Sequence, residues 1–173
     1  MTNYAPSTRA RVADLITGMR VETSTLAAAT YLLTGNTNTQ MFNVIGRIKI
    51  MQLYLEVVTD LSGTATDCFY TYTSTTPSIA VQPIGATNAA SMTGMKLGAR
   101  HICTGVTVAT GAVIDAQAGI SPVIMKEKMI IGLKGGVGTI GIDTATESMT
   151  SGTFKIILHY VPMSDGAYAT NIL

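Results

Sequence analysis

The sequence predicts an all-β protein, an antiparallel β-sandwich that is jelly-roll-like, with a short helix or arm at its N-terminus. Three observations predict this fold. Short apolar segments alternate with period two, turn-forming clusters separate them at short intervals, and no long amphipathic helix interrupts the pattern. A length of 173 residues suits one domain, with or without an arm. Because parallel βαβ units need crossover helices, the missing helical pattern disfavours an α/β architecture.

The first 24 residues differ from the remainder and are expected to form the arm or short helix. Four apolar residues recur there at the spacing of one helical face: Val12, Leu15, Ile16 and Met19. Arg9 and Arg11 precede this face. The functional interpretation is an arm that docks on a neighbouring subunit, and the alternative is a frayed terminus. We therefore expect an arm over residues 1–24 and a β-sandwich domain over residues 25–173.

Strand candidates follow the arm at short spacing. After an apolar stretch at 25–34 and the segment 41–61, they lie at 67–73, 78–82, 101–108, 112–116, 123–133, 137–142 and 153–161. Within 41–61 the apolar alternation changes phase between Ile50 and Met51, which predicts a bulge or bend near residue 50. The strand 153–161 has one fully apolar face and a mixed one, so we expect it to lie centrally in its sheet or to be covered on at least part of both faces.

The composition indicates a surface covered by partners. Charged residues make up 12% of the chain, against about 25% in a typical globular protein. Such a surface is either hidden by other subunits or embedded in a membrane, and the sequence has no run of about 18 apolar residues and no secretory signal. A net charge of +1 gives no general case for nucleic-acid binding. Without an export signal, Cys68 and Cys103 are expected to be reduced and buried.

A glycine-rich segment matches the pattern of a dinucleotide site but lacks its context. Gly136, Gly138 and Gly141 fit GxGxxG after an apolar strand. A dinucleotide site also needs a helix beginning there, whose amides hold the pyrophosphate. The residues that follow, 142–146, are rich in β-branched types, so we expect a glycine-rich hairpin turn and no cofactor.

Catalytic patterns are scarce. His101 and His159 lie within strand patterns and have no acidic neighbour in the sequence. The carboxylates are scattered singly, although a fold could bring two together for acid–base chemistry, or Asp143 and Glu147 could share a calcium ion. Solvated turn residues explain them more simply. We expect no catalytic residues and no metal site.

Aromatic residues leave one binding alternative open. Tyr70 and Tyr72 share one face of a predicted strand, with Tyr54 and Tyr160 as candidate neighbours. Together they would form a shelf on which sugars stack, as in a receptor- or glycan-binding module. The simpler interpretation is an aromatic pair packed within the sheet.

The stretch 138–167 resembles the end of small virion proteins of tailed bacteriophages. A glycine-rich turn is followed by Met149-Thr150-Ser151-Gly152-Thr153, then by a long apolar strand that closes in Tyr160-Val161-Pro162-Met163-Ser164. The remainder of the chain is similar to those proteins in its low charge and its Thr, Ala and Gly content. The resemblance implies a β-sandwich that decorates or cements a capsid, commonly as a trimer, or one that builds part of the tail or neck.

The expected partners follow from this resemblance. They are other copies of the chain and the major capsid protein or other virion proteins, in particles assembled in the host cytoplasm, with neither nucleic acid nor a membrane. Cementing a shell uses buried apolar area, arm exchange and sheet augmentation. The residues expected to contact partners lie in the arm and in the trailing C-terminus: Arg9, Arg11, Leu15, Ile16, Met19, Tyr168 and Ile172.

Overall fold

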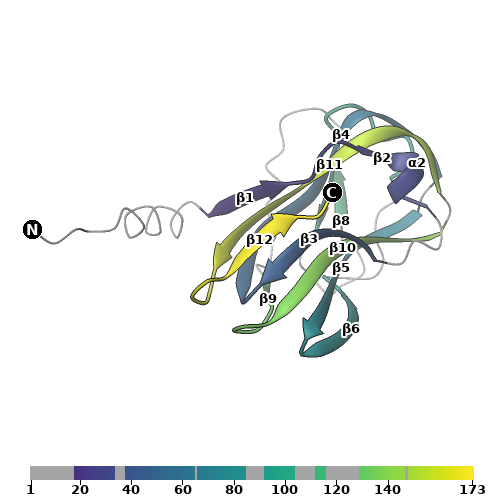
Figure 1. Cartoon of the computed structure of the whole chain (residues 1–173). Coiled ribbons are helices and arrows are strands. Elements are labelled where there is room, and N and C mark those ends of the chain that lie inside the picture. Colours follow the sequence, from purple (N-terminus) through teal and green to yellow (C-terminus); the bar gives the residue numbers. More distant parts are fainter. Residues whose placement is uncertain are drawn as a thin grey trace, which may run out of the picture.

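The computed structural model describes residues 18–33, 38–64, 66–84, 92–103, 112–115, 129–146 and 148–173. Two antiparallel sheets pack face to face (Figure 1), so the prediction of an all-β antiparallel sandwich is confirmed. Sheet A contains, in spatial order, β1 (Met19–Glu22), β11 (Met149–Pro162), β4 (Ile48–Gly63), β7 (Arg100–Cys103) and β8 (Ala112–Asp115). Two short strands join it, β2 (Leu26–Ala27) beside β11 and β9 (Ile130–Ile131) beside β4. Sheet B contains β12 (Tyr168–Asn171), β3 (Thr39–Ile45), β10 (Val137–Thr146), β5 (Thr66–Thr76) and β6 (Ser78–Pro83).

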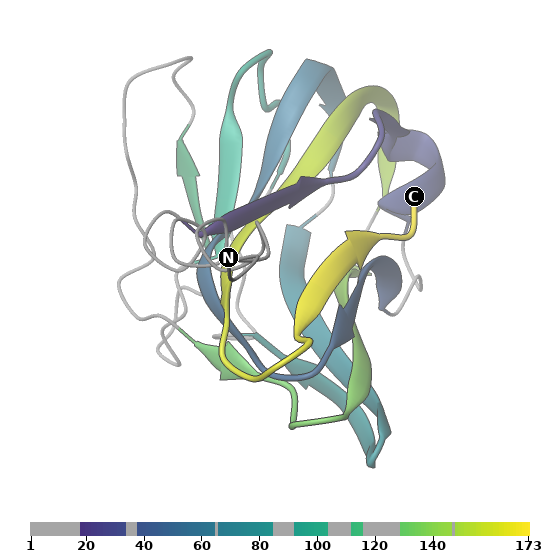
Figure 2. The ribbon, with the colours of Figure 1, turned by 60° about the vertical axis from the view of Figure 1, so that its left-hand side comes forward.

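The strand pairing is nested, as the jelly-roll expectation requires. Eight strands follow one another in the order β1, β3, β4, β5, β6, β7, β10 and β11. The first pairs with the last, the second with the seventh, the third with the sixth and the fourth with the fifth. This pairing is that of a long hairpin rolled up into two sheets, which is how a jelly roll of eight strands is wound. Figure 2 shows the two sheets from a second side.

The bulge expected near residue 50 is present in β4. His159 of β11 pairs with Gln52 and the next residue, Tyr160, pairs with Ile50, so Met51 has no partner of its own in the ladder. This extra residue resets the alternation, and Ile50 and Leu53 both point into the core. The chain changes sheets before the bulge, at Gly46, whose φ of 72° suits a tight turn between β3 and β4.

The core fills the space between the sheets and is tied across by two buried tyrosines. In β11, Phe154, Ile156, Leu158 and Tyr160 are each at most 1% exposed, which confirms the expected apolar face. The Tyr160 hydroxyl accepts a hydrogen bond from the Ala169 amide of sheet B at 2.9 Å. The second tyrosine comes from the other sheet: the Tyr70 hydroxyl of sheet B donates to the His101 carbonyl of sheet A at 2.6 Å. Each tyrosine therefore fixes one sheet against the other.

The N-terminal boundary differs from the expected one. Residues 1–17, with most of the expected arm, lie outside the described residues. Met19–Glu22 form β1, which pairs with β11 at the edge of sheet A, so the sandwich already includes residues that we had placed in the arm over 1–24. Met19 is therefore in a strand and not on a helical face. The alternation of Arg20, Val21 and Glu22 explains this, because it turns one apolar side chain toward the core and two charged ones to solvent.

Two other segments depart from the expected strands. After β2 the chain forms one helical turn, α2 (Ala28–Tyr31), in place of a strand through 25–34. In the segment 123–133, Ile130–Ile131 is the strand within the described part. Within the described ranges, no helix has both the length and the apolar character needed to cross a bilayer.

The GxGxxG segment forms a turn, as expected, but the turn is not a hairpin. The Gly136 amide donates to the Leu133 carbonyl at 2.8 Å, and the turn leads from β9 in sheet A to β10 in sheet B. A strand follows the glycines, so the helix N-terminus of a dinucleotide site is absent from this place. Packing explains the glycines, because a Cβ at Gly138 would lie 2.5 Å from the Tyr72 hydroxyl and one at Gly141 would overlap the Asn38 side chain.

Removing the Tyr160 hydroxyl should destabilise the sandwich. In Tyr160→Phe the amide of Ala169, a residue 7% exposed, loses its hydrogen-bond acceptor, and we expect the free energy of unfolding to fall by about 1–3 kcal/mol. Urea denaturation measures this change. The matched control is Tyr168→Phe, because Tyr168 is 45% exposed and its substitution should change stability by less than about 0.5 kcal/mol. Equal effects of the two substitutions would contradict the proposed tie between the sheets.

Candidate assembly surface

The two outer faces of the sandwich differ in charge. The strands of sheet A carry many charged side chains: Arg20, Glu22, Lys49, Glu56, Asp60, Arg100, Asp115 and Lys155. In the strands of sheet B the charged residues are Asp67 and Asp143, and there is no basic residue. A soluble protein that exposed both faces to water would gain from charges on both. The difference marks the outside of sheet B as the candidate contact surface.

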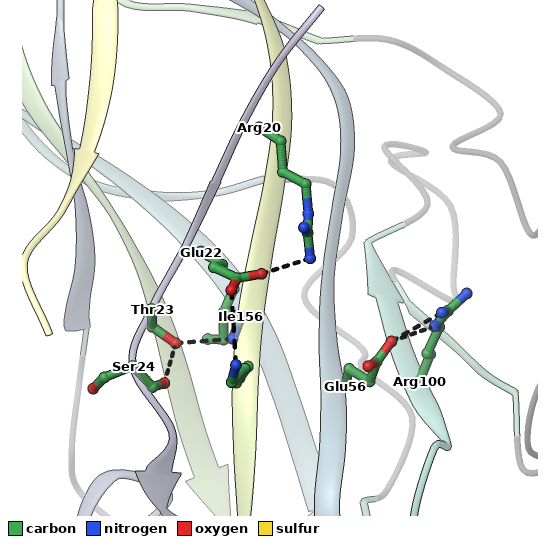
Figure 3. A network of polar contacts seen from close by, with 8 residues as sticks. Arg20, Glu22, Thr23, Ser24, Glu56, Arg100 and Ile156 are labelled. Atoms are coloured by element: carbon green, nitrogen blue, oxygen red, sulfur yellow. Dashed lines mark hydrogen bonds and ion pairs between the residues drawn. The ribbon is translucent and has the colours of Figure 1, made fainter.

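The outer face of sheet A satisfies its own charges (Figure 3). Glu22 of β1 accepts from Arg20 at 2.5 Å and lies 3.7 Å from the Lys155 ammonium of β11. Glu56 of β4 pairs with Arg100 of β7 at 2.9 Å. All these side chains are more than a third exposed, so each pair contributes little stability, on the order of 0–1 kcal/mol. These ion pairs are accessible to solvent, although the same sheet also exposes one apolar side chain, Ile130 of β9, at 55%.

Beside these ion pairs, Thr23 holds the chain against β11 at the interruption between β1 and β2. The Thr23 hydroxyl accepts from the Ile156 amide at 3.0 Å and donates to the Ser24 carbonyl at 2.9 Å. The Thr23 amide in turn donates to the Ile156 carbonyl at 3.0 Å. These bonds keep the chain attached to β11 where the strand pairing is interrupted, so β1 and β2 together form one edge of sheet A.

Planar side chains form a row across the strands of sheet A. The Arg100 guanidinium lies 5.1 Å from the centre of the Tyr54 ring, a cation–π contact. On β11, the His159 ring is stacked near the same ring, at 6.3 Å between centres and 20° between planes. Arg20 of β1 is directly opposite His159 in the strand register. Tyr54 therefore packs with cationic and imidazole groups on the outer face and not with the buried Tyr160.

The expected sugar-stacking shelf does not form from the four tyrosines. Tyr70 and Tyr160 are each 1% exposed in the core, and Tyr72 is partly buried against it. Tyr70 packs near the His101 ring, at 5.7 Å between centres. The alternative interpretation, aromatic residues packed inside the sandwich, is confirmed for Tyr70.

Burial lowers the pKa of His159, and the positive charge of Arg20 lowers it further. Arg20 and the Tyr54 ring are the groups that face His159 from β1 and β4, and no carboxylate is paired with it among the described residues. At neutral pH the imidazole is therefore uncharged. The folded protein binds this proton less readily than the unfolded chain, whose histidine pKa is about 6.5.

Acidification should destabilise the protein through His159. Because the pKa of His159 is lower in the folded state, the unfolded state binds more protons below about pH 6.5, and the free energy of unfolding should fall as the pH drops below that value. Urea denaturation at a series of pH values measures the change, and His159→Gln should remove this part of it. In Arg20→Gln the pKa of His159, followed by NMR, should rise. A His159 pKa at or above 6.5 in the wild-type protein would contradict this reading of the site.

The outer face of sheet B is built from cross-strand rows of uncharged side chains. Thr170, Asn43, Thr139 and Thr73 are aligned in register across β12, β3, β10 and β5. The residues between them, such as Val44 and Ala169, are buried, so this row points outward. A second row contains Tyr168, Ile45 and Val137. We call these residues, with Ile172, the sheet B face.

Apolar side chains are exposed along this face. Tyr168, Ile172 and Val137 are 45%, 39% and 37% exposed. The strand β6 at the edge of the same sheet adds Val81 and Ile79, at 42% and 40%. Scattered apolar residues are normal on a protein surface. Here they share one sheet that has no basic side chain, and this combination favours contact with a partner.

The polar groups at the centre of the sheet B face are satisfied within the chain. Asn38 has a φ of 58°. Its side-chain Nδ2 donates to the Thr73 hydroxyl at 2.8 Å, and its Oδ1 accepts from the Thr71 hydroxyl at 2.6 Å. The side chain reaches these threonines by passing over Gly141, where a Cβ would obstruct it. Because Asn38 and the threonines bond one another, a partner can cover this part of the face without leaving them unpaired.

The expected contact residues have different outcomes. Tyr168 and Ile172 lie together on or beside β12 and belong to the sheet B face. Met19 is partly buried against the core in β1, which makes it a packing residue of the sandwich. The other expected contacts lie outside the described residues: Arg9, Arg11, Leu15 and Ile16. Sequence reasoning missed Val137 and Ile45, because their place on the face depends on the pairing of strands far apart in the chain.

Residues singled out for chemistry are mostly buried. His101, Cys68 and Cys103 are fully buried, as expected for the cysteines, and neither cysteine is in a disulfide. Burial raises the pKa of Asp143, while Glu147, its candidate calcium partner, lies outside the described residues. In the part of the chain that the structure describes, no three His, Cys, Asp or Glu side chains are grouped to hold a metal ion.

Comparison of the chain with protein-family models, with curated proteins and with solved structures finds no match.

Proposed function

We propose that this chain is a non-enzymatic structural protein of a virion, which decorates or cements a bacteriophage capsid by packing between subunits. The observation that carries the proposal is the contrast between the two outer faces. Sheet A presents ion-paired charges to solvent, whereas the sheet B face exposes Tyr168, Ile172 and Val137 with no basic side chain. The choice of a bacteriophage particle rests on the resemblance of 138–167 to virion proteins of tailed phages.

The physical chemistry of the sheet B face suits such a role. Covering apolar surface contributes about 25 cal/mol for each Å² removed from water. The cost of burying charges is small here, because β3, β10 and β12 contain a single charged residue, Asp143. This residue is already largely buried in the isolated chain, with 9% of its surface exposed. The exposed side chains of Asn43 and Thr170 in the outward row offer hydrogen bonds that would fix the orientation of a partner. The face can therefore be buried at low cost by other copies of the chain or by a capsid protein.

Two other functions use the same surface. A structural subunit of the phage tail or neck would assemble through the same contacts and differ in its place on the particle. A receptor- or glycan-binding module is favoured by one feature, the exposed Tyr168 in the row next to Thr170 and Asn43, since sugars stack on aromatic rings and bond to amides and hydroxyls. Binding on a glycan array that Tyr168→Ala abolishes would support the module and count against the assembly role.

Self-association of the purified chain tests the proposal. Size-exclusion chromatography with light scattering should give a mass above that of one 18.1 kDa chain, rising with concentration. Val137→Lys places a charge on the sheet B face and should lower this mass, because the lysine would be buried without a counter-charge. Thr150→Lys is the matched control, since it adds the same charge at an exposed residue of β11 in sheet A and should leave the mass unchanged.

Circular dichroism shows whether each variant keeps the wild-type fold. A wild-type chain that stays monomeric at every concentration would contradict assembly through copies of itself. An equal loss of mass in Val137→Lys and Thr150→Lys would show that added charge, and not the sheet B face, controls association.

A further inference from the structure

Among the described strands, β6 is an edge of sheet B. It pairs with β5 alone among the described strands and is the last strand of sheet B. Ser78 through Gln82 are all exposed, including Ile79 and Val81. Figures 1 and 2 both show the β5–β6 hairpin reaching past the ends of the neighbouring strands. One side of β6 thus presents backbone N–H and C=O groups that no described strand pairs.

Two other edges of the described sandwich are charged or covered, whereas β6 carries no charge. At one edge of sheet A, β1 carries Arg20 and Glu22. At the far edge of sheet B, β12 lies against β1, and the Leu173 carbonyl accepts from the Ser24 amide at 2.9 Å. Natural proteins place charges or a cover on free edges because bare edges pair with other strands. In contrast, the chain has no charged residue between Asp67 and Lys96, a stretch that contains β6.

We propose that β6 pairs antiparallel with β6 of a second copy, across a two-fold axis, so that sheet B continues from one copy into the other. The inference rests on the proposed assembly function and names the partner of this edge. A second copy fits because a strand without charges meets itself with no like charges opposed. Two-fold contacts are also the commonest in homo-oligomers, and they give the antiparallel pairing that is the more stable per residue.

The sequence of β6 sets the extent of this contact. Pro77 and Pro83 have no amide hydrogen, so the new ladder is confined to the segment between them, 78–82, whose middle residue is Ala80. The pairing with β5 is irregular, because the two residues between Ile79 and Gln82 face a single residue of β5. Such a bulge twists the edge. The contact is therefore short, and it depends on the packing of Ile79 and Val81 as well as on backbone bonds.

Charge insertion on β6 tests the inference. In a two-fold contact every substitution enters twice, so Val81→Lys places two ammonium groups on one face of the joined sheet, each opposite the apolar Ile79 of the other copy when the axis passes through Ala80. Light scattering should show an even-numbered wild-type assembly whose mass falls to half in Val81→Lys, with a dissociation constant raised by about tenfold or more. Thr150→Lys on sheet A should keep the wild-type mass. Circular dichroism and the urea midpoint establish that Val81→Lys is folded.

Cross-linking tests the register directly. If all residues between the two prolines are used, the axis passes through Ala80, which then faces its own counterpart within the reach of a disulfide. Ala80→Cys should form a covalent dimer under mild oxidation. Thr150→Cys, an exposed site on β11 in sheet A and away from both proposed contacts, should stay monomeric on a non-reducing gel. The native Cys68 and Cys103 are fully buried and should not interfere.

The outcomes separate this inference from the proposed function. A wild-type chain that is monomeric at every concentration would overturn both. An assembly that Val137→Lys disrupts but Val81→Lys leaves intact, or one with an odd number of subunits, would overturn the β6 pair and leave the assembly role standing. Absence of the Ala80→Cys dimer in an even-numbered assembly would likewise overturn it.

Discussion

The whole structure depends on one shared apolar layer between two sheets, each of which can offer it only one face. Side chains alternate along a strand, so every strand that buries Phe42, Phe154 or Leu158 must turn its intervening residues outward. The nested pairing brings β1 beside β11 and β3 beside β10 around this layer. Tyr160 reaches from sheet A to the Ala169 amide, and Tyr70 reaches from sheet B to the His101 carbonyl, so the two bonds set the relative position of the sheets as well as their separation.

Because the inner residues carry the stability, the outer faces are free to differ, and their difference is where function is to be sought. Sheet A uses this freedom for ion pairs and for the row that includes Tyr54 and His159. Sheet B uses it for threonine, asparagine and exposed apolar groups. Neither choice follows from the needs of folding, since an isolated sandwich would be more soluble with charges on both sides. A contact surface does account for the uncharged side.

Local alternation made much of the fold predictable from the sequence. The phase change at Met51 indicated the bulge in β4, and the apolar residues of 153–161 indicated a central strand. Long-range pairing was less accessible. That the glycine turn joins two sheets, that Met19 belongs to a strand, and that Val137 lies in one row with Tyr168 all depend on partners distant in the chain. The composition pointed to a hidden surface, but only the strand order shows which surface is uncharged.

Folding and the proposed association therefore depend on different residues. Substitutions at buried residues such as Tyr160 act on the layer that holds the sheets together and should change stability and assembly together. Substitutions at Val81 or Val137 act on side chains that already contact water in the isolated chain, so their effect on folding is small. The stretch without charges around β6 would be a liability in a protein that remained alone, since nothing in it opposes strand pairing. In a subunit that assembles, the same stretch keeps the desolvation cost of the contact low, because no charge has to be removed from water to form it.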